Sequence, residues 1–296
     1  MKVLITGAAG FIGSHIADAL LAEGHHVTGI DNLSTGRTDN WHGPEDLIVG
    51  DIADSVPDND PDVIYHCAAS YRDRDDWEGD ARTNVLGTIK VVRLAQRTGA
   101  KIVYFQTSLC YGPRTIPALP TSPVDPHGSY AITKTAAEQF IIDSGVPYVS
   151  LRLANMYGPR NLSGPVPTFY KRLSAGESCY VVDARRDYVY VADLVGLAVK
   201  CLVDGQGVYH ASSGTDNTIG GLWLQVVAAM GLVVPPPIYT PRGDDDVARL
   251  LIDPSDTQRD FGWQASTSLQ QGIKAAVDWY AAHGVTETFT HLGARG

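Results

Sequence analysis

Two side chains near the middle of the chain could carry out acid–base chemistry together. Tyr130 and Lys134 belong to the segment Tyr-Ala-Ile-Thr-Lys, and a spacing of four residues on a helix places both on one face. An ammonium group beside a phenol stabilises the phenolate and lowers the pKa of the tyrosine toward neutrality. Such a phenol is a general base that can take a proton from a hydroxyl group while a hydride leaves the same carbon. The pattern also occurs by chance, so its interpretation depends on the rest of the chain.

A pair of hydroxyl residues closes the expected strand that precedes this helix. Thr107 and Ser108 begin the segment Thr-Ser-Leu-Cys-Tyr-Gly, which ends at Gly112. A hydroxyl at the edge of a sheet can donate to a reacting oxygen and relay its proton. Threonine and serine are also common in ordinary turns, and the residue types alone do not distinguish Thr107 from Ser108.

Three glycines follow the first apolar run at intervals of three residues. Gly7 permits a tight turn after the strand, Gly10 lets the backbone approach a pyrophosphate, and Gly13 lets the following helix pack closely on the strand. The N-terminus of that helix then directs free N–H groups at the phosphates. A tight-packing turn without a ligand is the alternative interpretation.

An acidic residue ends the second expected strand. Asp31 lies eighteen residues after Gly13, where a carboxylate can accept hydrogen bonds from the hydroxyls of an adenosine ribose. The same charge would repel a 2′-phosphate, which favours NAD over NADP, although the nearby Arg37 could accommodate such a phosphate. Together with the glycines, Asp31 predicts a dinucleotide-binding site.

Short apolar strands alternate with amphipathic helices through the first half of the chain. This alternation predicts an α/β, Rossmann-like fold, in which a doubly wound parallel sheet binds ligands at the carboxyl ends of its strands. The expected strands cover residues 3–6, 26–30, 47–50, 63–67, 101–107 and 148–152, and the expected helices cover 11–23, 83–97 and 130–143.

The second half of the chain is less regular. Residues 158–165 and 235–237 are rich in proline and glycine, residues 242–246 suggest an acidic loop, and a last helix is expected over 268–283. From Gly284 onward we expect a loosely held terminus. We therefore expect an NAD-binding Rossmann domain over 1–155, to which 187–212 return, and a smaller substrate-binding domain made of 156–186 and 213–296.

Composition argues against several other classes of protein. The 296 residues are 44% hydrophobic without an apolar run that could span a membrane, and the formal net charge of −10 disfavours nucleic acid as a partner. No secretory leader is visible, and the cysteines lack metal-ligand spacing, so we expect a cytoplasmic protein without a metal. The four cysteines, Cys67, Cys110, Cys179 and Cys201, are expected to be reduced.

Further motifs follow the glycine loop in a definite order. They are Gly50-Asp-Ile52, His66-Cys-Ala-Ala69, Asn84-Val-Leu-Gly-Thr88, Arg152-Leu-Ala-Asn155-Met-Tyr-Gly-Pro159, Arg186-Asp-Tyr-Val-Tyr-Val191 and Phe261-Gly-Trp263. With these motifs the chain resembles, almost end to end, the extended short-chain dehydrogenase/reductase family. The resemblance is to its NAD-dependent epimerase/dehydratase branch, which acts on nucleotide-activated sugars.

The resemblance implies roles for individual residues. Thr107, Tyr130 and Lys134 would be catalytic, and the cofactor would be NAD. The residues that bind NAD would be Gly7, Gly10, Phe11, Ile12, Gly13, Asp31, Asn32, Asp51, Ile52, Ala68, Asn84, Tyr130 and Lys134. A nucleotide-diphosphate sugar would contact Arg72, Thr107, Ser108, Leu109, Tyr130, Asn155, Arg185, Arg186 and Arg242.

The residues before Tyr111 bear on the reaction that the resemblance implies. In the family the catalytic Ser or Thr lies four residues before this tyrosine, which is Thr107 here. Similar dehydratases and decarboxylases carry acidic residues in between, where this chain has Ser108 and Leu109. Cys110 is out of register for a catalytic thiol and is interpreted as core. The resemblance therefore implies epimerisation at C4 of the sugar, with Tyr130 and Thr107 moving the hydroxyl proton.

Other functions and substrates stay open at this stage. A dehydratase or decarboxylase, an NAD-coupled reductase and an NAD-sensing module without turnover are the alternatives. Arg72, Arg74 and Arg185 lie near segments that face the sugar in the family, where Arg72 or Arg185 could meet the carboxylate of a uronic acid or an extra phosphate. A solvated helix start is the simpler interpretation of the charged segment that holds Arg72 and Arg74.

A homodimer is also expected from the resemblance. Similar proteins pair through two helices of each subunit, and twofold pairing is the commonest symmetry. The expected interface residues are Val85, Ile89, Val92, Ala136, Phe140 and Ile141, and the alternative is that these side chains only face the core.

Overall fold

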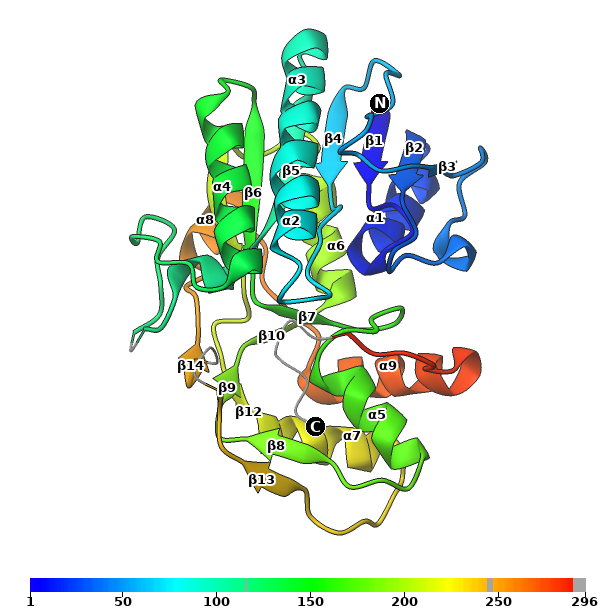
Figure 1. Ribbon diagram of the computed structural model, residues 1–296, viewed down its shortest axis with the longest axis vertical. Helices are drawn as coiled ribbons and strands as arrows, with labels where there is room; N and C mark the ends of the chain where they lie inside the picture. The colour runs from blue at the N-terminus through cyan, green and yellow to red at the C-terminus, as the bar shows by residue number, and fades with distance from the viewer. Residues whose placement is uncertain (115, 244–246, 290–296) are drawn as a thin grey trace.

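The computed structural model describes residues 1–114, 116–243 and 247–289 (Figure 1). Within them, a seven-stranded parallel sheet has the strand order β11-β6-β5-β4-β1-β2-β3. The predicted α/β, Rossmann-like fold class is therefore confirmed. The strands are β1 (Lys2–Thr6), β2 (His26–Asp31), β3 (Ile48–Val49), β4 (Val63–His66), β5 (Lys101–Thr107), β6 (Tyr148–Leu153) and β11 (Gly207–Ala211).

Helices cover both faces of this sheet. Successive residues of a strand point to opposite sides, so each strand contributes apolar side chains to the layer on either face. On one face, Val3 and Ile5 of β1 share an apolar cluster with α1 (Phe11–Ala22) and α6 (Val191–Lys200). On the other face, Leu4 shares a second cluster with α3 (Thr88–Thr98) and α4 (Ser129–Asp143). The sheet is buried from both sides.

The direction in which strands are added reverses at β1. β2 and β3 lie on one side of β1, whereas β4, β5 and β6 lie on the other. Doubly wound sheets bind ligands in the crevice that opens outside the carboxyl ends of the strands at such a reversal. Gly7, Cys67 and Thr107, at the ends of β1, β4 and β5, all line one cleft.

A smaller part of the molecule lies below the sheet in Figure 1. Its helices α5 (Pro165–Ser174), α7 (Ile219–Ala229) and α9 (Leu269–His283) contribute to an apolar cluster that includes Phe169, Trp223 and Tyr280. Among the short strands, β7 (Asn155–Tyr157) pairs with β10 (Tyr188–Tyr190). The others are β8 (Tyr180–Val182), β9 (Arg185–Arg186), β12 (Asn217–Thr218), β13 (Ile238–Thr240) and β14 (Arg249–Leu250).

Two segments differ from the sequence expectation. The helix expected over 83–97 is preceded by α2 (Trp77–Asp80), passes through the π-helical segment η2 (Ala81–Gly87), and ends as α3.

The expectation of a loosely held terminus is wrong for residues 284–289. Phe289 N donates to Leu162 O at 2.9 Å, and Gly164 N donates to Phe289 O at 3.0 Å, because this segment lies along the loop before α5. Asp244, Asp245 and Asp246 of the expected acidic loop lie outside the described residues.

The remaining helical segments are short. They are the 3-10 turns η1 (Thr38–Asn40) and η3 (Ser108–Tyr111) and the helix α8 (Ser255–Phe261). None of the described helices combines the length and the apolar character needed to cross a lipid bilayer.

Candidate active site

A cleft of about 990 Å³ runs along the carboxyl edge of the sheet and extends to the smaller part of the molecule. Its lining combines the glycine loop, the residues that follow β2, β4 and β5, the start of α4, and the segments around Asn155 and Arg186. The residues predicted to bind cofactor and those predicted to bind substrate therefore meet, for the most part, in one continuous space.

The glycine loop has the geometry that its three-residue spacing predicts. Gly7 has a φ of +68°, and a Cβ there would lie 2.7 Å from Ala68 N, so neither conformation nor space allows a side chain. A Cβ at Gly13 would lie 2.2 Å from Gly7 O, which is the close contact between helix and strand. Gly10 lines the cleft and is the N-cap residue of α1, and no side chain caps the first N–H groups of this helix. The first N–H groups of α1 are thus available to an anion in the cleft.

Asp31 is held at the end of β2 by the backbone around it. Its two carboxylate oxygens accept hydrogen bonds from Ala9 N at 2.9 Å and Leu33 N at 2.8 Å. Burial raises the pKa of this carboxyl. A carboxylate has about four acceptor positions, so both oxygens can still accept from ribose hydroxyls. Arg37 also lines the cleft, but its guanidinium lies 3.6 Å from Asp39, which offsets the positive charge that a 2′-phosphate would need.

The other residues predicted to bind NAD divide into two groups. Those that line the cleft are Phe11, Ile12, Asn32, Asp51, Ile52 and Ala68. Asn84 is not among the described lining residues. It is buried, accepts from Ser70 N at 2.8 Å, and donates to Ser70 O at 2.9 Å and Thr133 Oγ1 at 3.0 Å. In this structure Asn84 joins the segment after β4 to α4.

The three predicted catalytic residues lie together in the cleft. Tyr130 and Lys134 come from successive turns of α4, and Thr107 ends β5. The ring of Tyr130 meets Tyr71 edge-on, with 6.0 Å between the centroids. Lys134 is buried, and its Nζ lies 4.0 Å from the centroid of the Tyr104 ring. This arrangement brings a phenol, a hydroxyl and an amine into the same cleft.

The charge states of these groups differ from the sequence expectation. Burial raises the pKa of Tyr130, and Tyr71 and Asp80 raise it further. Burial lowers the pKa of Lys134 to about 7. The expectation that Lys134 brings the tyrosine pKa down is therefore wrong for the polypeptide by itself, because burial disfavours the charged form of both groups.

The turn after β5 arranges the next four residues. Thr107 Oγ1 accepts from Leu109 N at 3.2 Å, so its own proton is free to be donated into the cleft. Ser108 and Leu109 also line the cleft, and Ser108 is buried. Cys110 is fully buried beside Tyr111, and burial raises the pKa of its thiol to about 12. The interpretation of Cys110 as a core residue agrees with this environment.

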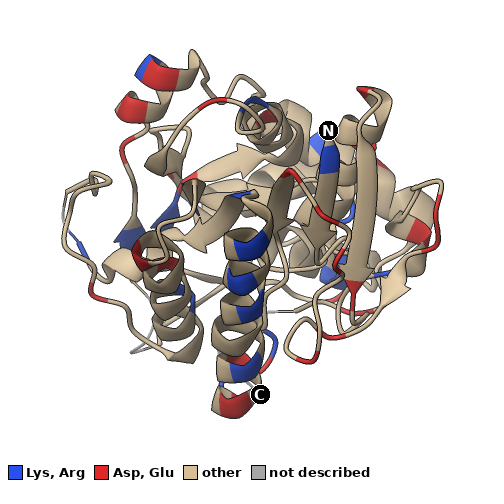
Figure 2. Cartoon of the chain, turned by 90° about the horizontal axis from the view of Figure 1, so that it is seen from above, with Lys and Arg blue, Asp and Glu red and all other residues tan. Residues whose placement is uncertain are grey.

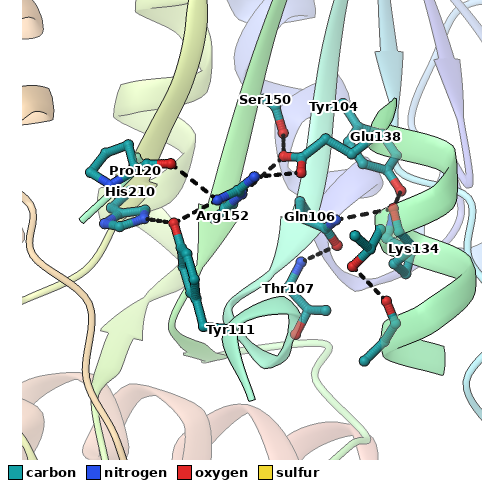
Figure 3. Close-up of polar contacts among 12 residues, drawn as sticks. Tyr104, Gln106, Thr107, Tyr111, Pro120, Lys134, Glu138, Ser150, Arg152 and His210 are labelled. Carbon is teal, nitrogen blue, oxygen red and sulfur yellow. Dashed lines mark hydrogen bonds and ion pairs between the residues drawn. The ribbon is translucent and has the colours of Figure 1, made fainter. Parts of the chain in front are cut away.

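A buried polar network joins α4 to the neighbouring strands (Figure 3). Glu138, one turn after Lys134, pairs with Arg152 of β6 at 2.7 Å. Arg152 also donates to the hydroxyl of Tyr111 at 2.7 Å, and that hydroxyl lies 2.6 Å from His210 Nε2. Because His210 Nδ1 faces the carbonyl of Asp253 at 2.8 Å, Nδ1 carries the proton and Nε2 accepts. The network ties α4 to β6 and β11.

Two hydrogen bonds from side chains to the main chain hold the turn of α4 that carries Lys134. Gln106 Nε2 and the hydroxyl of Tyr104 both donate to Lys134 O, each at 3.0 Å (Figure 3). Gln106 Oε1 in turn accepts from Thr107 N at 2.8 Å. The sheet thus fixes the position of Thr107 relative to α4.

The polar residues predicted to bind substrate are not equally placed. Asn155 and Arg186 line the cleft. Arg185, the neighbour of Arg186 in β9, is not among the described lining residues and pairs with Asp216 at 2.7 Å. The alternation of side chains along a strand explains why only one of two consecutive arginines faces the cleft. Arg242 is exposed and is also absent from the described lining.

Arg72 lines the cleft but already has partners. Its guanidinium lies 3.5 Å from Glu287 and 4.7 Å from the centroid of the Phe289 ring, and Nη1 donates to Ser34 O at 3.3 Å. Arg72 and Arg185 each face a carboxylate of this chain, so the structure adds no support to the hypothesis of a uronic-acid substrate. Arg74, the third arginine of the prediction, also lines the cleft.

Sequence reasoning missed several residues of the cleft. Tyr71, Asp80, Arg160 and Phe289 all line it. Arg160 has a φ of +65° and donates to Asp18 of α1 at 2.7 Å. The charged segment after β4 was a signal for Tyr71, whereas nothing local marks Phe289, which reaches the cleft from the far end of the chain.

These features define a class of protein. The cleft has glycines where a side chain would collide with backbone, a helix N-terminus open to an anion, and a buried carboxylate at the end of β2, which together fit a dinucleotide. A hydroxyl, a phenol and an amine stand together in the same cleft. The molecule is a Rossmann-type enzyme that uses a dinucleotide cofactor.

Comparison with known proteins identifies the family. Residues 3–211 match the NAD dependent epimerase/dehydratase family, and the chain belongs to this family. Its cofactor is NAD, as the sequence predicted.

Individual relatives are similar over almost the whole chain. UDP-glucose 4-epimerase from Mycolicibacterium smegmatis is 33% identical over 313 aligned positions, which cover 95% of this chain and 98% of the relative. The structure of WbmH from Bordetella bronchiseptica in complex with NAD+ is 45% identical with a TM-score of 0.91, covering 96% of this chain and 99% of that one. WbmG from the same organism, in complex with NAD and UDP, is 39% identical with a TM-score of 0.90, covering 100% and 99%.

Proposed function

We propose that this enzyme is a nucleotide-sugar epimerase that inverts C4 through a transient 4-keto sugar, with NAD held tightly throughout. The observation that carries the proposal is the set of side chains after β5 and on α4. Thr107, Tyr130 and Lys134 share the cleft with Leu109, which has no group that moves protons. Redox chemistry at one carbon needs no further acid or base in that turn. The similarity to a UDP-glucose 4-epimerase and to a UDP-bound structure supports a UDP-sugar as substrate.

The chain's own residues have separate roles in this proposal. Bound NAD supplies a hydride acceptor and a positive charge. Tyr130 takes the C4 hydroxyl proton, and Thr107 donates a hydrogen bond to the reacting oxygen and relays its proton. Lys134, beneath the tyrosine on α4, stabilises the phenolate when it is protonated. The keto sugar then turns its other face to the same residues, and return of the proton and the hydride completes the inversion.

The diphosphate of the substrate needs local cations. Charged residues of both signs are distributed over several elements (Figure 2), and the net charge of −10 would repel an anion at long range. We propose Asn155 and Arg186 as the groups that bind the diphosphate, since a guanidinium can bind phosphate oxygens in bidentate fashion. Arg242 is a third candidate.

The experiment is incubation of the purified protein with a panel of nucleotide sugars, followed by chromatography and mass spectrometry. The proposal expects a C4 epimer of unchanged mass, formed without net accumulation of NADH. Loss of water or carbon dioxide would instead identify a dehydratase or a decarboxylase. Stoichiometric NADH would identify a simple oxidoreductase.

We also propose a homodimer, with an interface that differs in part from the sequence expectation. Val92 and Ile141 are buried in the core and cannot contribute. Phe140 is 47% exposed on α4, and Ile132, two turns before it, is 51% exposed. Exposed apolar groups two turns apart on one helix suit pairing with a second copy.

The cytoplasmic location of the protein stays a prediction.

A further inference from the structure

His66 is a fully buried histidine that no predicted role uses. It ends β4, is 0% exposed, and opens the motif His66-Cys-Ala-Ala69. An imidazole that is shielded from water needs protein partners for both of its ring nitrogens. Nδ1 lies 2.7 Å from Thr6 Oγ1, and Nε2 lies 2.8 Å from Thr88 Oγ1. The ring therefore bridges β1, which Thr6 ends, and α3, which Thr88 begins.

The other partners of the two threonines fix where the proton of the imidazole lies. Thr88 Oγ1 donates its single proton to Asn84 O at 2.5 Å, because a carbonyl can only accept. Thr88 must therefore accept from His66, which places a proton on Nε2. Thr6 Oγ1 accepts from Ala68 N at 3.2 Å, and among the described contacts of Thr6 it is Nδ1 that can accept the hydroxyl proton. His66 is thus held as the neutral tautomer with its proton on Nε2.

The resulting chain of hydrogen bonds runs in one direction and holds one wall of the cleft at two points. It starts at Ala68 N and ends at the carbonyl of Asn84. The side chain of Asn84 in turn accepts from Ser70 N at 2.8 Å and donates to Ser70 O at 2.9 Å. Residues 67–70 all line the cleft, so this stretch is anchored at Ala68 and again at Ser70.

The glycine loop packs directly on the anchored stretch. A Cβ on Gly7 would lie 2.7 Å from Ala68 N, so the two backbones are in close contact. Both residues line the cleft, and both are among the residues predicted to bind NAD. Thr6, whose hydroxyl receives the Ala68 N–H group, directly precedes Gly7. A shift of Ala68 would therefore be transmitted to the loop that receives the cofactor.

The neutral state of His66 also bears on the charge of Lys134. The ring of His66 packs against the ring of Tyr104 on β5, with 5.6 Å between the centroids. Lys134 of α4 places its Nζ 4.0 Å from the centroid of the same tyrosine ring. Burial, and then the charge of Lys134, lower the pKa of His66 to about 3. An uncharged imidazole adds no second positive charge beside this lysine.

We propose that His66 is a positioning residue for the NAD site, which acts as a fixed, neutral bridge in the chain of hydrogen bonds and not as an acid or a base. Its two nitrogens set the separation of Thr6 and Thr88, and through Thr6 the position of Ala68 beside the glycine loop. Loss of either hydrogen bond should loosen this wall of the cleft and let NAD leave faster. The inference concerns retention of the cofactor, so it goes beyond the proposed epimerase activity.

The first measurement locates the proton on the ring. The histidine nitrogens of the NAD-loaded enzyme are labelled isotopically, and their NMR signals are followed from about pH 5 to about pH 8, where an ordinary histidine titrates. The signals of His66 are those that His66→Gln lacks. We expect the proton on Nε2 throughout, whereas His210, which is also buried, should carry its proton on Nδ1. A proton on Nδ1 of His66, or the gain of a second proton in this range, would overturn the inference.

The second measurement follows release of the cofactor from the loaded enzyme. Enzyme that carries radiolabelled NAD is mixed with excess unlabelled NAD, and the rate of exchange is compared between variants. Thr6→Val keeps the shape of the side chain without its hydroxyl, and should exchange at least about fivefold faster because buried groups lose their partner. His66→Leu should do the same. His66→Gln keeps one donor and one acceptor and cannot be charged, so it should stay closer to wild type.

Thr257→Val is the matched control for Thr6→Val. Thr257 is also 0% exposed, donates to His210 O at 2.7 Å and accepts from His210 N at 3.1 Å, but it is not among the described residues that line the cleft. The control should exchange NAD like wild type, although it also loses buried hydrogen bonds.

Three results of the exchange experiment would each overturn the inference. They are an unchanged rate in Thr6→Val, an equal increase in Thr257→Val, and a His66→Gln variant that exchanges as fast as His66→Leu. If His66→Leu does not fold, the comparison of Thr6→Val with Thr257→Val carries the same expectation. Exchange requires no turnover, so its outcome is distinguishable from failure of the proposed epimerase activity.

Discussion

Lys134 illustrates how a residue with a proposed catalytic role can oppose the stability of its own fold. The side chain is 2% exposed, and its pKa falls to about 7 from the ordinary value of 10.5. Between these two values the unfolded chain binds a proton that the folded chain does not. The free energy of unfolding must therefore rise with pH across this window, and the cost of burying the ammonium is fully present below about pH 7.

Replacing this lysine by an apolar residue of similar length tests the argument. Lys134→Met should raise the free energy of unfolding of the cofactor-free protein at about pH 7 by about 1–3 kcal/mol, while abolishing turnover. The measurement is urea unfolding at about pH 7 and about pH 9. The gain over wild type should shrink at the higher pH, where the wild-type lysine gives up its proton more easily. A gain that is equal at both values would contradict the assigned cause.

The proposed catalytic role of Tyr130 leads to a second expectation. Tyr130→Phe should fold and bind NAD but lose turnover by at least about a hundredfold, the usual contribution of a general base. Tyr71→Phe is the matched control, because it removes a neighbouring phenol oxygen and keeps the ring contact. Steady-state kinetics with the substrate found in the panel gives the result. Comparable losses in both variants would argue against Tyr130 as the base.

Thr107 and Ser108 can be distinguished by the same kinetics. Thr107→Ala should lower the turnover number by a smaller factor than Tyr130→Phe, since it removes a relay and not the base. Ser108→Ala should be close to wild type. The opposite order would show that the register counted back from Tyr111 is wrong.

At the scale of elements, the close contact between α1 and the loop before it should depend on Gly13, which has a hydrogen atom where other residues have a Cβ. A Cβ at Gly13 would lie 2.2 Å from a backbone oxygen that cannot move without the strand, whereas a Cβ at Gly10 would lie 3.2 Å from the same atom. Gly13→Ala should therefore lower the free energy of unfolding by about 1–3 kcal/mol. Gly10→Ala should lower it less, and should mainly weaken NAD binding. Urea unfolding and calorimetry with NAD separate the two effects, and equal destabilisation would contradict the proposed close packing.

The sequence predicted those elements and site residues whose geometry is local. Gly13 and Asp31 lie within one strand–helix–strand unit, and the spacing from Tyr130 to Lys134 lies within one helix, so their placement follows from period and position. Arg160 and Phe289 line the cleft and are held by contacts with distant parts of the chain, Arg160 with Asp18 and Phe289 with Leu162. No local pattern contains that information, so sequence reasoning could not assign them.

Strand β9 shows a second limit of sequence reasoning. Arg185 and Arg186 are adjacent and of one type, so the sequence gives no means of choosing between them. Which one faces the cleft is set by pairing of β9 with β12 and β14. The pair Arg185 and Asp216 arises from that pairing, since Asp216 directly precedes β12.

For the whole molecule, the exposed apolar face of α4 leads to a prediction about assembly. Phe140→Asp should convert a dimer to a monomer, because a charge would be buried at the proposed interface. Tyr239→Asp is the control, since Tyr239 is 67% exposed on β13, far along the chain from α4. Multi-angle light scattering at micromolar concentration decides the matter. A wild-type monomer would remove the proposal, and so would a dimer that survives the Phe140 change.

The division into two domains stays a prediction. The sheet topology bears on one part of it, the return of a later segment of the chain to the first domain. β11 pairs with β6, and α6 packs on α1, so residues from about 191 to 211 complete a layer that begins at residue 2. We propose that the returning segment expected over 187–212 folds with the first 155 residues.

The packing of α6 on α1 constrains how the protein can be made. α1 precedes α6 by a long stretch of chain, so the part of its apolar side that packs on α6 stays uncovered until α6 has been synthesised. Contacts between such distant segments slow folding and leave apolar surface exposed in the meantime. A nascent chain that stalls before residue 191 should therefore be a substrate for chaperones or proteases, even though the glycine loop and Tyr130 are already present in it.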